Sequence, residues 1–176
     1  MVIQVVTRHR YLGDFIGDRV VEKRWLAGNI TGWGDSVETI AWVSQNHLQS
    51  VYEGLQKSIH HEWVFMQRVT PGIGNAFGLV EKALQETFVP DLFKGLGEGA
   101  PERGVTRLPV KQAELALPDP TQTAPESWTT SCVITGHPVT ELRGQVELWK
   151  ADHSAYIQEG RAAVQIRSKQ RAEEAL

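Results

Sequence analysis

The sequence predicts a mainly α-helical protein with an N-terminal β-hairpin, a helical bundle, a Gly/Pro-rich linker and C-terminal helices. Three observations support this prediction. Apolar residues recur at steps of three and four over much of the first ninety residues, which is the period of an amphipathic helix. Five of the eight prolines lie within residues 101–126, where regular structure is disfavoured. The predicted regions are a hairpin with a thumb-like bundle at 1–93, a linker at 94–123 and a helical segment at 124–176.

The composition is typical of a soluble globular protein with a core of its own. The chain has 176 residues, of which 41% are hydrophobic and 22% are charged. No apolar run approaches the roughly 18 residues that a membrane span requires, and the N-terminus lacks the pattern of a signal peptide. Cys132 is the single cysteine, so an intrachain disulfide is excluded. We therefore expect an intracellular protein, in the cytoplasm or the nucleus, that does not enter a membrane.

The charge balance argues against a protein that binds nucleic acid strongly by itself. The formal net charge is -3 and the pI is about 6.1. Phosphate contacts dominate the affinity of nucleic-acid-binding proteins, which usually show a basic patch or a high pI. Any contact of this chain with nucleic acid is therefore expected at a few points, as part of something larger.

The predicted hairpin lies at the start of the chain. Residues 2–7 are rich in β-branched types, which favour a strand. Residues 7–10 are predicted to form a polar turn, and residues 11–16 the return strand. Gly13 and Gly17 allow a positive φ or a close backbone approach at this hairpin.

The first predicted helix begins after Asp18, a good N-cap residue that precedes an apolar pair. Because an interior glycine costs up to about 1 kcal/mol relative to alanine, we expect a kink or a break near Gly32 and Gly34. Asp35 or Ser36 would then cap a new helix. The apolar stripe consists of Leu26, Ile30, Trp33, Val37 and Ile40.

Two more amphipathic stripes complete the predicted bundle. The second runs from Leu48 to Met66 and ends at residues 70–72, where Pro and Gly stop a helix. The third runs from Ile73 to Phe88 and is expected to stop at Pro90. Three such helices can bury their stripes against one another as a compact bundle.

Beyond the linker, helix formers return. A helical group is predicted from about residue 124 with a pause at residues 136–138, where the sequence is Gly-His-Pro. From about Gln145 the apolar stripe is thin, which is typical of an exposed helix or of one that needs a partner. In the linker, Leu108, Val110, Leu115 and Leu117 could hold the chain onto the bundle.

No catalytic or metal-binding set emerges from the residue patterns. His60, His61 and Glu62 could suggest a small metal-dependent hydrolase, but adjacent helical residues point about 100° apart. A zincin helix needs a histidine four residues after His61, where Phe65 stands. Aspartates do not pair in a strand-turn-strand setting, and Tyr-x-Asp-Asp is absent. We therefore predict no catalytic residue, no metal site and no cofactor in this chain.

Four blocks in order resemble a known family. The blocks are 10–17 (RYLGDFIG), 55–71 (LQKSIHHEWVFMQRVTP), 88–93 (FVPDLF) and 108–120 (LPVKQAELALPDP). The first is similar to the primer-grip hairpin that follows the palm of reverse transcriptases, and the others are similar to segments that follow it in retrotransposon proteins. Ala113 and Glu114 depart from the pattern, because two glycines are common there. The resemblance covers most of residues 8–120.

The resemblance implies the thumb and post-thumb part of a retrotransposon RNA-directed DNA polymerase. The fingers and the palm, with the aspartates that bind Mg²⁺, precede the hairpin in that family and would lie before Met1. This chain by itself would be inactive, and it would meet primer-template nucleic acid only within the full-length enzyme. The implied contacts with the primer and its phosphates are Arg8, Arg10, Tyr11, Leu12, Gly13, Lys23 and Arg24.

An alternative remains open at this point. The same helical pattern fits a non-catalytic all-α protein-interaction module that is unrelated to reverse transcriptases and whose hairpin is structural. The sequence does not predict the oligomeric state in either case.

Overall fold

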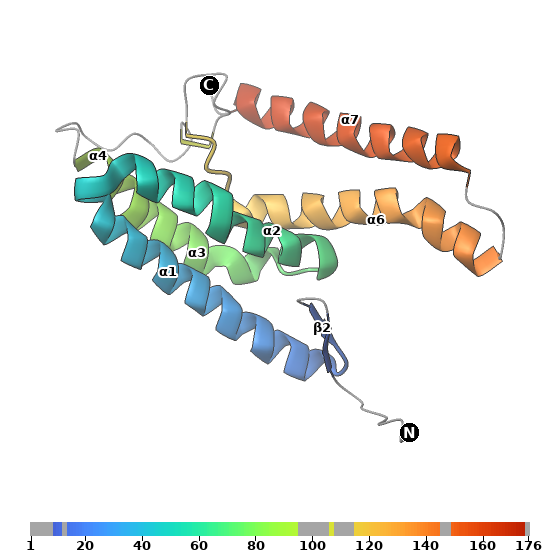
Figure 1. Ribbon diagram of the computed structural model, residues 1–176, viewed down its shortest axis with the longest axis horizontal. Helices are drawn as coiled ribbons and strands as arrows, with labels where there is room; N and C mark the ends of the chain where they lie inside the picture. The colour runs from blue at the N-terminus through green and yellow to red at the C-terminus, as the bar shows by residue number, and fades with distance from the viewer. Residues whose placement is uncertain (1–8, 12–13, 95–105, 108–114, 145–148, 175–176) are drawn as a thin grey trace.

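The computed structural model describes residues 9–11, 14–94, 106–107, 115–144 and 149–174, and these are mainly helical. Figure 1 shows two parts. Three antiparallel helical runs form a bundle from the N-terminal half, and two long antiparallel helices extend past one end of that bundle. The predicted mainly α class is therefore confirmed for the described part of the chain.

The described N-terminal residues do not support the hairpin that the sequence predicted. Strands β1 (His9–Tyr11) and β2 (Asp14–Ile16) pair antiparallel, with Tyr11 opposite Asp14. Residues 9 and 10 therefore lie in a strand, where the sequence had predicted a turn. The other predicted strand, residues 2–7, lies outside the described residues.

Helix α1 (Arg19–Gly54) starts where the sequence predicted. The Asp18 carboxylate accepts hydrogen bonds from the N–H groups of Val20 (2.8 Å) and Val21 (3.3 Å). The predicted break at Gly32–Gly34 is wrong, because the helix continues through these glycines. Its irregular point is His47 (φ −139°, ψ 48°), where the helix is kinked. Burial of the apolar stripe on both sides of the glycines outweighs their propensity cost.

The second helical run ends as predicted. A π turn, η1 (Leu55–Ile59), leads into α2 (His60–Val69). Thr70 has an extended backbone, and Gly72 has a φ of 70°. Glycine adopts this left-handed conformation without the steric cost of a Cβ, which explains why the helix stops here.

The third run does not stop at Pro90, contrary to the sequence prediction. Pro90 is the second residue of α4, directly after a π turn in which the N–H of Val89 bonds to the carbonyl of Leu84. Proline is tolerated in the first turn of a helix, because its missing N–H would lack a partner there. The run consists of η2 (Gly74–Phe77), α3 (Gly78–Ala83), η3 (Leu84–Phe88) and α4 (Val89–Lys94).

The core lies between these three runs. The rings of Trp33 and Phe77 stack at a centroid distance of 6.1 Å, and Phe77 is fully buried. The apolar stripes that the sequence predicted supply most of the other core residues. Apart from Leu117 and Ala124, all buried hydrophobic residues of the described chain lie between Leu26 and Leu92. Each large apolar side chain buried here contributes about 1.5–3 kcal/mol.

The end of the linker crosses the second helical run. Its backbone carbonyls receive side-chain hydrogen bonds: Tyr52 Oη donates to the carbonyl of Leu115 (2.7 Å), and Gln56 Nε2 donates to that of Ala116 (2.8 Å). Leu117 is buried in the core, as predicted, and Leu115 packs against it. Leu108 and Val110 lie outside the described residues.

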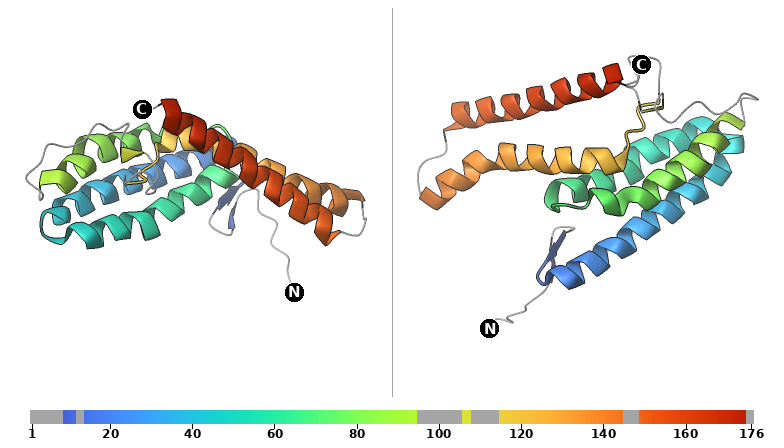
Figure 2. Two further views of the ribbon diagram at one scale, coloured as in Figure 1. Left: turned by 90° about the horizontal axis from the view of Figure 1, so that it is seen from above. Right: turned by 180° about the vertical axis from the view of Figure 1, so that it is seen from behind.

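Helices α6 (Pro120–Gly144) and α7 (Lys150–Glu174) form the second part, and they run antiparallel (Figure 2). The predicted pause at residues 136–138 is wrong, because α6 continues through Pro138; in Figure 1 it bends in this second half, as helices do at proline. A Cβ on Gly160 of α7 would lie 2.9 Å from Ile134 Cγ1 of α6. This glycine therefore sets the close approach of the two helices.

Candidate nucleic-acid interface

The structure describes only some of the seven contact residues that the resemblance implies. Arg8, Leu12 and Gly13 lie outside the described residues. Arg10 and Tyr11 belong to β1, but their side chains lie outside the described part. These five contacts remain predictions.

Lys23 and Arg24 lie on the first turns of α1, and both side chains are exposed. They do not face the same way, since adjacent helical residues differ by about 100°. Lys23 lines a pocket of about 280 Å³, and Arg24 does not. The structure brings Lys23 together with Arg19, four residues earlier and on the same face of α1. The sequence analysis did not single out Arg19, although this i, i+4 spacing could have revealed the pair.

The pocket, which we call the α1 pocket, lies between the start of α1 and the turn after α2. The α1 wall carries the charges, and the wall opposite is the backbone and side chains of the helix stop. The lining residues are Arg19, Glu22, Lys23, Leu26, Ala27, Thr70, Pro71, Gly72, Ile73 and Ala76. Two cations and one carboxylate therefore border a cavity whose other lining residues are mostly apolar.

Thr70 adds a polar group to the α1 pocket. Its side chain is 5% exposed, and its hydroxyl has no hydrogen-bond partner among the described residues. A buried hydroxyl without a partner costs free energy. Thr70 has an extended backbone at the end of α2, so the helix stop places this residue in the wall of the pocket.

The α1 pocket can bind an anionic group. The guanidinium of Arg19 and the ammonium of Lys23 donate hydrogen bonds and carry positive charge, which suits phosphate oxygens. Asp18 caps the helix N-terminus and Glu22 lines the pocket, so the two carboxylates balance the formal charge of the two cations. The arrangement supports binding and positioning, since the pocket combines donors and charge without a nucleophile beside a general base.

The histidine cluster on α2 packs against the bundle. His60 makes an edge contact with the ring of Trp63 at a centroid distance of 5.4 Å, and Glu62 accepts a hydrogen bond from Trp33 Nε1 (3.0 Å). Burial lowers the pKa of His60 to about 4, with a smaller effect from the neighbouring His61. Within the described ranges, His, Cys, Asp and Glu side chains do not gather in a group of three that could hold a metal ion.

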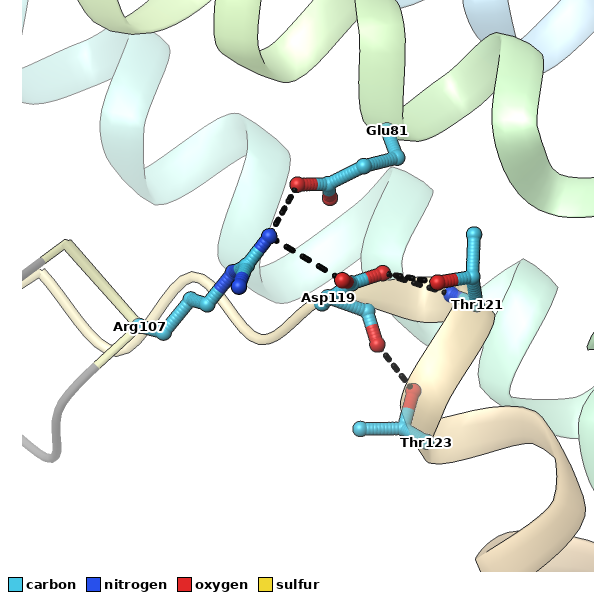
Figure 3. A network of polar contacts seen from close by, with 5 residues as sticks. All are labelled: Glu81, Arg107, Asp119, Thr121 and Thr123. Carbon is cyan, nitrogen blue, oxygen red and sulfur yellow. Dashed lines mark hydrogen bonds and ion pairs between the residues drawn. The ribbon is translucent and has the colours of Figure 1, made fainter. Parts of the chain in front are cut away.

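A second polar cluster holds the linker to the bundle (Figure 3). Arg107 Nη2 lies 2.8 Å from Glu81 Oε1 on α3 and 3.0 Å from Asp119 Oδ2 before α6. The other Asp119 oxygen accepts from the backbone N–H and the hydroxyl of Thr121 at 2.8 and 2.6 Å, and Thr123 donates to the Asp119 carbonyl at 3.1 Å. The Asp119 oxygens cap α6 and pair with Arg107, while Arg107 Nε is buried without a hydrogen-bond partner among the described residues. The sequence analysis missed this cluster, because its members are far apart in the chain.

Comparisons with known proteins do not identify a family or a relative for the chain. A scan against protein-family models found no match, and searches of curated proteins and of solved structures found no similar protein. Among the helices of the described residues, none is long and apolar enough to cross a membrane.

Proposed function

We propose that this chain positions primer-template nucleic acid, as the thumb and post-thumb region of a retroelement reverse transcriptase does, and that it has no catalytic activity of its own. The four ordered sequence blocks support the family. The α1 pocket supports the role, because Arg19 and Lys23 lie immediately after the 10–17 block that resembles a primer grip. The position of this basic pair is the observation that carries the proposal.

The binding mode follows from the chemistry of the pocket. Arg19 and Lys23 would contact phosphodiester oxygens. Phosphate contacts fix the register of a nucleic acid without reading its sequence. The pocket offers only two cations, and the chain has a net charge of -3. The chain should therefore bind nucleic acid weakly by itself, and its affinity should fall as the salt concentration rises.

Catalysis would require groups that this sequence does not supply. Phosphoryl transfer by polymerases uses carboxylates that hold two metal ions, and a Tyr-x-Asp-Asp block does not occur in this chain. We therefore expect no template-dependent nucleotide incorporation by the purified chain with Mg²⁺ present. Primer extension above background would overturn this half of the proposal.

The binding half is tested by fluorescence anisotropy with a labelled RNA–DNA primer-template over a range of KCl concentrations. The Arg19→Gln/Lys23→Gln variant should lower the affinity at low salt and reduce the slope of log K against log salt by about 2. The control variant Lys57→Gln/Lys82→Gln removes the same charge from exposed side chains on other helices and should behave as the wild type does. Equal losses in both variants would contradict a specific role for the pocket.

A second candidate function is a protein-interaction module. The observation that favours it is the exposure of large apolar side chains, since Trp42 is 76% exposed and Trp149 is 65% exposed. Aromatic residues are enriched at protein interfaces. Absence of primer-template binding at low salt, together with self-association that Trp42→Gln abolishes, would favour this function over the first.

A further inference from the structure

A groove of about 630 Å³ lies between α6, α7 and the end of α2. We call this groove the α6 groove. On its α6 side, most lining residues carry hydroxyls and recur at helical spacing. A helix that packs between two neighbours usually presents apolar residues at such positions. The hydroxyl residues that line it are Thr123, Ser127, Thr130, Ser131 and Thr135. Ile134 and Val164 add apolar surface to the lining, so the groove combines a row of hydroxyl residues with apolar patches.

Two arginines stand on either side of these hydroxyls. Arg68 comes from the last turns of α2 and Arg161 from α7. Both side chains are exposed, and neither has an ion-pair partner among the described residues. Glu126 is the acidic side chain in the lining. The charge at the groove is thus positive in a chain whose total is negative.

A third arginine adds unused hydrogen-bonding capacity beside the groove. Arg167 Nη2 donates to Thr130 Oγ1 at 3.1 Å, while Arg167 Nε is buried without an acceptor among the described residues. Since Thr130 accepts in this contact, its own proton remains available. The hydroxyl of Ser131 makes no hydrogen bond with the described residues. The hydroxyls of Thr123, Ser127 and Thr135 already donate to protein oxygens. The free hydroxyl donors of the groove are therefore those of Thr130 and Ser131.

The length and lining of the groove indicate what it would bind. Thr123 and Thr135 are separated by about 18 Å along α6, at about 1.5 Å per residue. The lining has no aromatic side chain on which a base could stack. Two neighbouring hydroxyl donors between flanking arginines in an elongated groove suit a ligand that carries several anionic oxygens in line, which is the pattern of a phosphodiester backbone.

We propose that the α6 groove binds the sugar-phosphate backbone of a nucleic-acid strand, with Arg68 and Arg161 at its phosphates and the Thr130 and Ser131 hydroxyls as additional donors. This proposal rests on the proposed function for the class of ligand, but its residues are separate from those of the α1 pocket. It gives the α6–α7 pair a role in holding a strand that extends beyond the bundle.

The test is the affinity of the full chain for a short fluorescein-labelled oligothymidylate, measured by anisotropy across a KCl series. The Arg68→Gln/Arg161→Gln variant should bind about tenfold more weakly at low salt and lose about 1.4 from the salt slope, because two contacts with a single strand are removed. The charge-matched control Lys57→Gln/Lys82→Gln should keep the wild-type values. Both arginines are exposed, so a circular dichroism spectrum identical to that of the wild type is expected.

Competition identifies the source of the phosphate. Unlabelled oligothymidylate should displace the probe at far lower concentration than thymidine monophosphate or inorganic phosphate. Equal potency per phosphate would contradict a backbone groove. If Arg19→Gln/Lys23→Gln weakens primer-template binding while Arg68→Gln/Arg161→Gln changes neither ligand, the α6 groove proposal fails and the proposed function stands. If neither variant changes either ligand, both proposals fail.

Discussion

The bundle of residues 19–94 and the α6–α7 pair are both built from long antiparallel helices, but different interactions hold them. The bundle holds nearly all of the buried hydrophobic residues of the described chain, whereas α6 and α7 meet through hydroxyls, histidines, an arginine and the close approach of Gly160 to Ile134. Trp33 stacks on Phe77 in the first part, and Tyr156 stacks on His137 in the second at a centroid distance of 4.7 Å. An apolar core gives stability, and a polar seam leaves groups free to meet a ligand.

The largest expected effect is in the bundle core. Phe77→Ala removes a fully buried ring and should lower the free energy of unfolding by about 3–5 kcal/mol, through lost transfer energy and the cavity that remains. Val164→Ala, in the α6–α7 seam, should cost less than about 1.5 kcal/mol, since Val164 is only partly buried. Urea denaturation measures both. Equal losses would show that the two parts share one kind of core.

The next effect concerns the cluster that joins the two parts. Arg107→Met removes the cation between Glu81 and Asp119, whose side chains are 12% and 7% exposed. We expect a loss of about 2–4 kcal/mol, because breaking a buried pair leaves uncompensated charge. Lys57→Met, at an exposed pair with Glu53, should cost less than about 1 kcal/mol. Thermal unfolding of both variants checks this, and a small effect of Arg107→Met would contradict a structural role for the cluster.

A glycine substitution tests whether α7 depends on close contact with α6. In Gly160→Leu the new side chain would collide with Ile134, and such overpacking costs about 1–3 kcal/mol. Gly136→Leu serves as the control, because a Cβ there meets no atom within 4 Å. Hydrogen exchange should accelerate in α7 of the Gly160 variant, while residues 26–41 remain protected. Loss of protection throughout the chain would show instead that the two parts unfold together.

The smallest expected effect is a pH dependence that belongs to the bundle. Burial disfavours the charged ring and lowers the pKa of His60 from its ordinary value of 6.5 to about 4 in the folded chain. The unfolded chain therefore binds the proton first, so stability is complete above pH 6.5 and falls as the pH is lowered toward 4. After allowance for partial exposure, the loss should be about 1–2 kcal/mol.

The variant His60→Gln should flatten this part of the stability profile measured by urea titration at several pH values. His61→Gln is the control. His61 is exposed and contributes only the smaller part of the shift, so most of the slope should remain. An unchanged slope in His60→Gln would assign the pH dependence to other groups.

The comparison between the two parts also explains what the sequence could predict. The stripes of the bundle were visible because each helix buries one apolar face, and Asp18 and Gly72 marked a start and a stop by local chemistry. Gly32, Pro90 and Pro138 led to wrong predictions of helix breaks. At these positions burial and the neighbouring turns outweigh the local cost of glycine or proline in a helix. The pairing of Arg19 with the Thr70 turn and the α6 groove depend on tertiary contacts, which a single helix pattern does not contain.

The central claim is that nucleic acid meets the chain at the start of α1 and at the turn after α2. Hydrogen exchange of the full chain, with and without an RNA–DNA primer-template at low salt, tests it most directly. We expect slower exchange in residues 19–27 and 70–76 when the duplex is bound, with residues 48–59 unchanged. Protection that is absent from both segments, or that appears only in residues 48–59, would contradict the account.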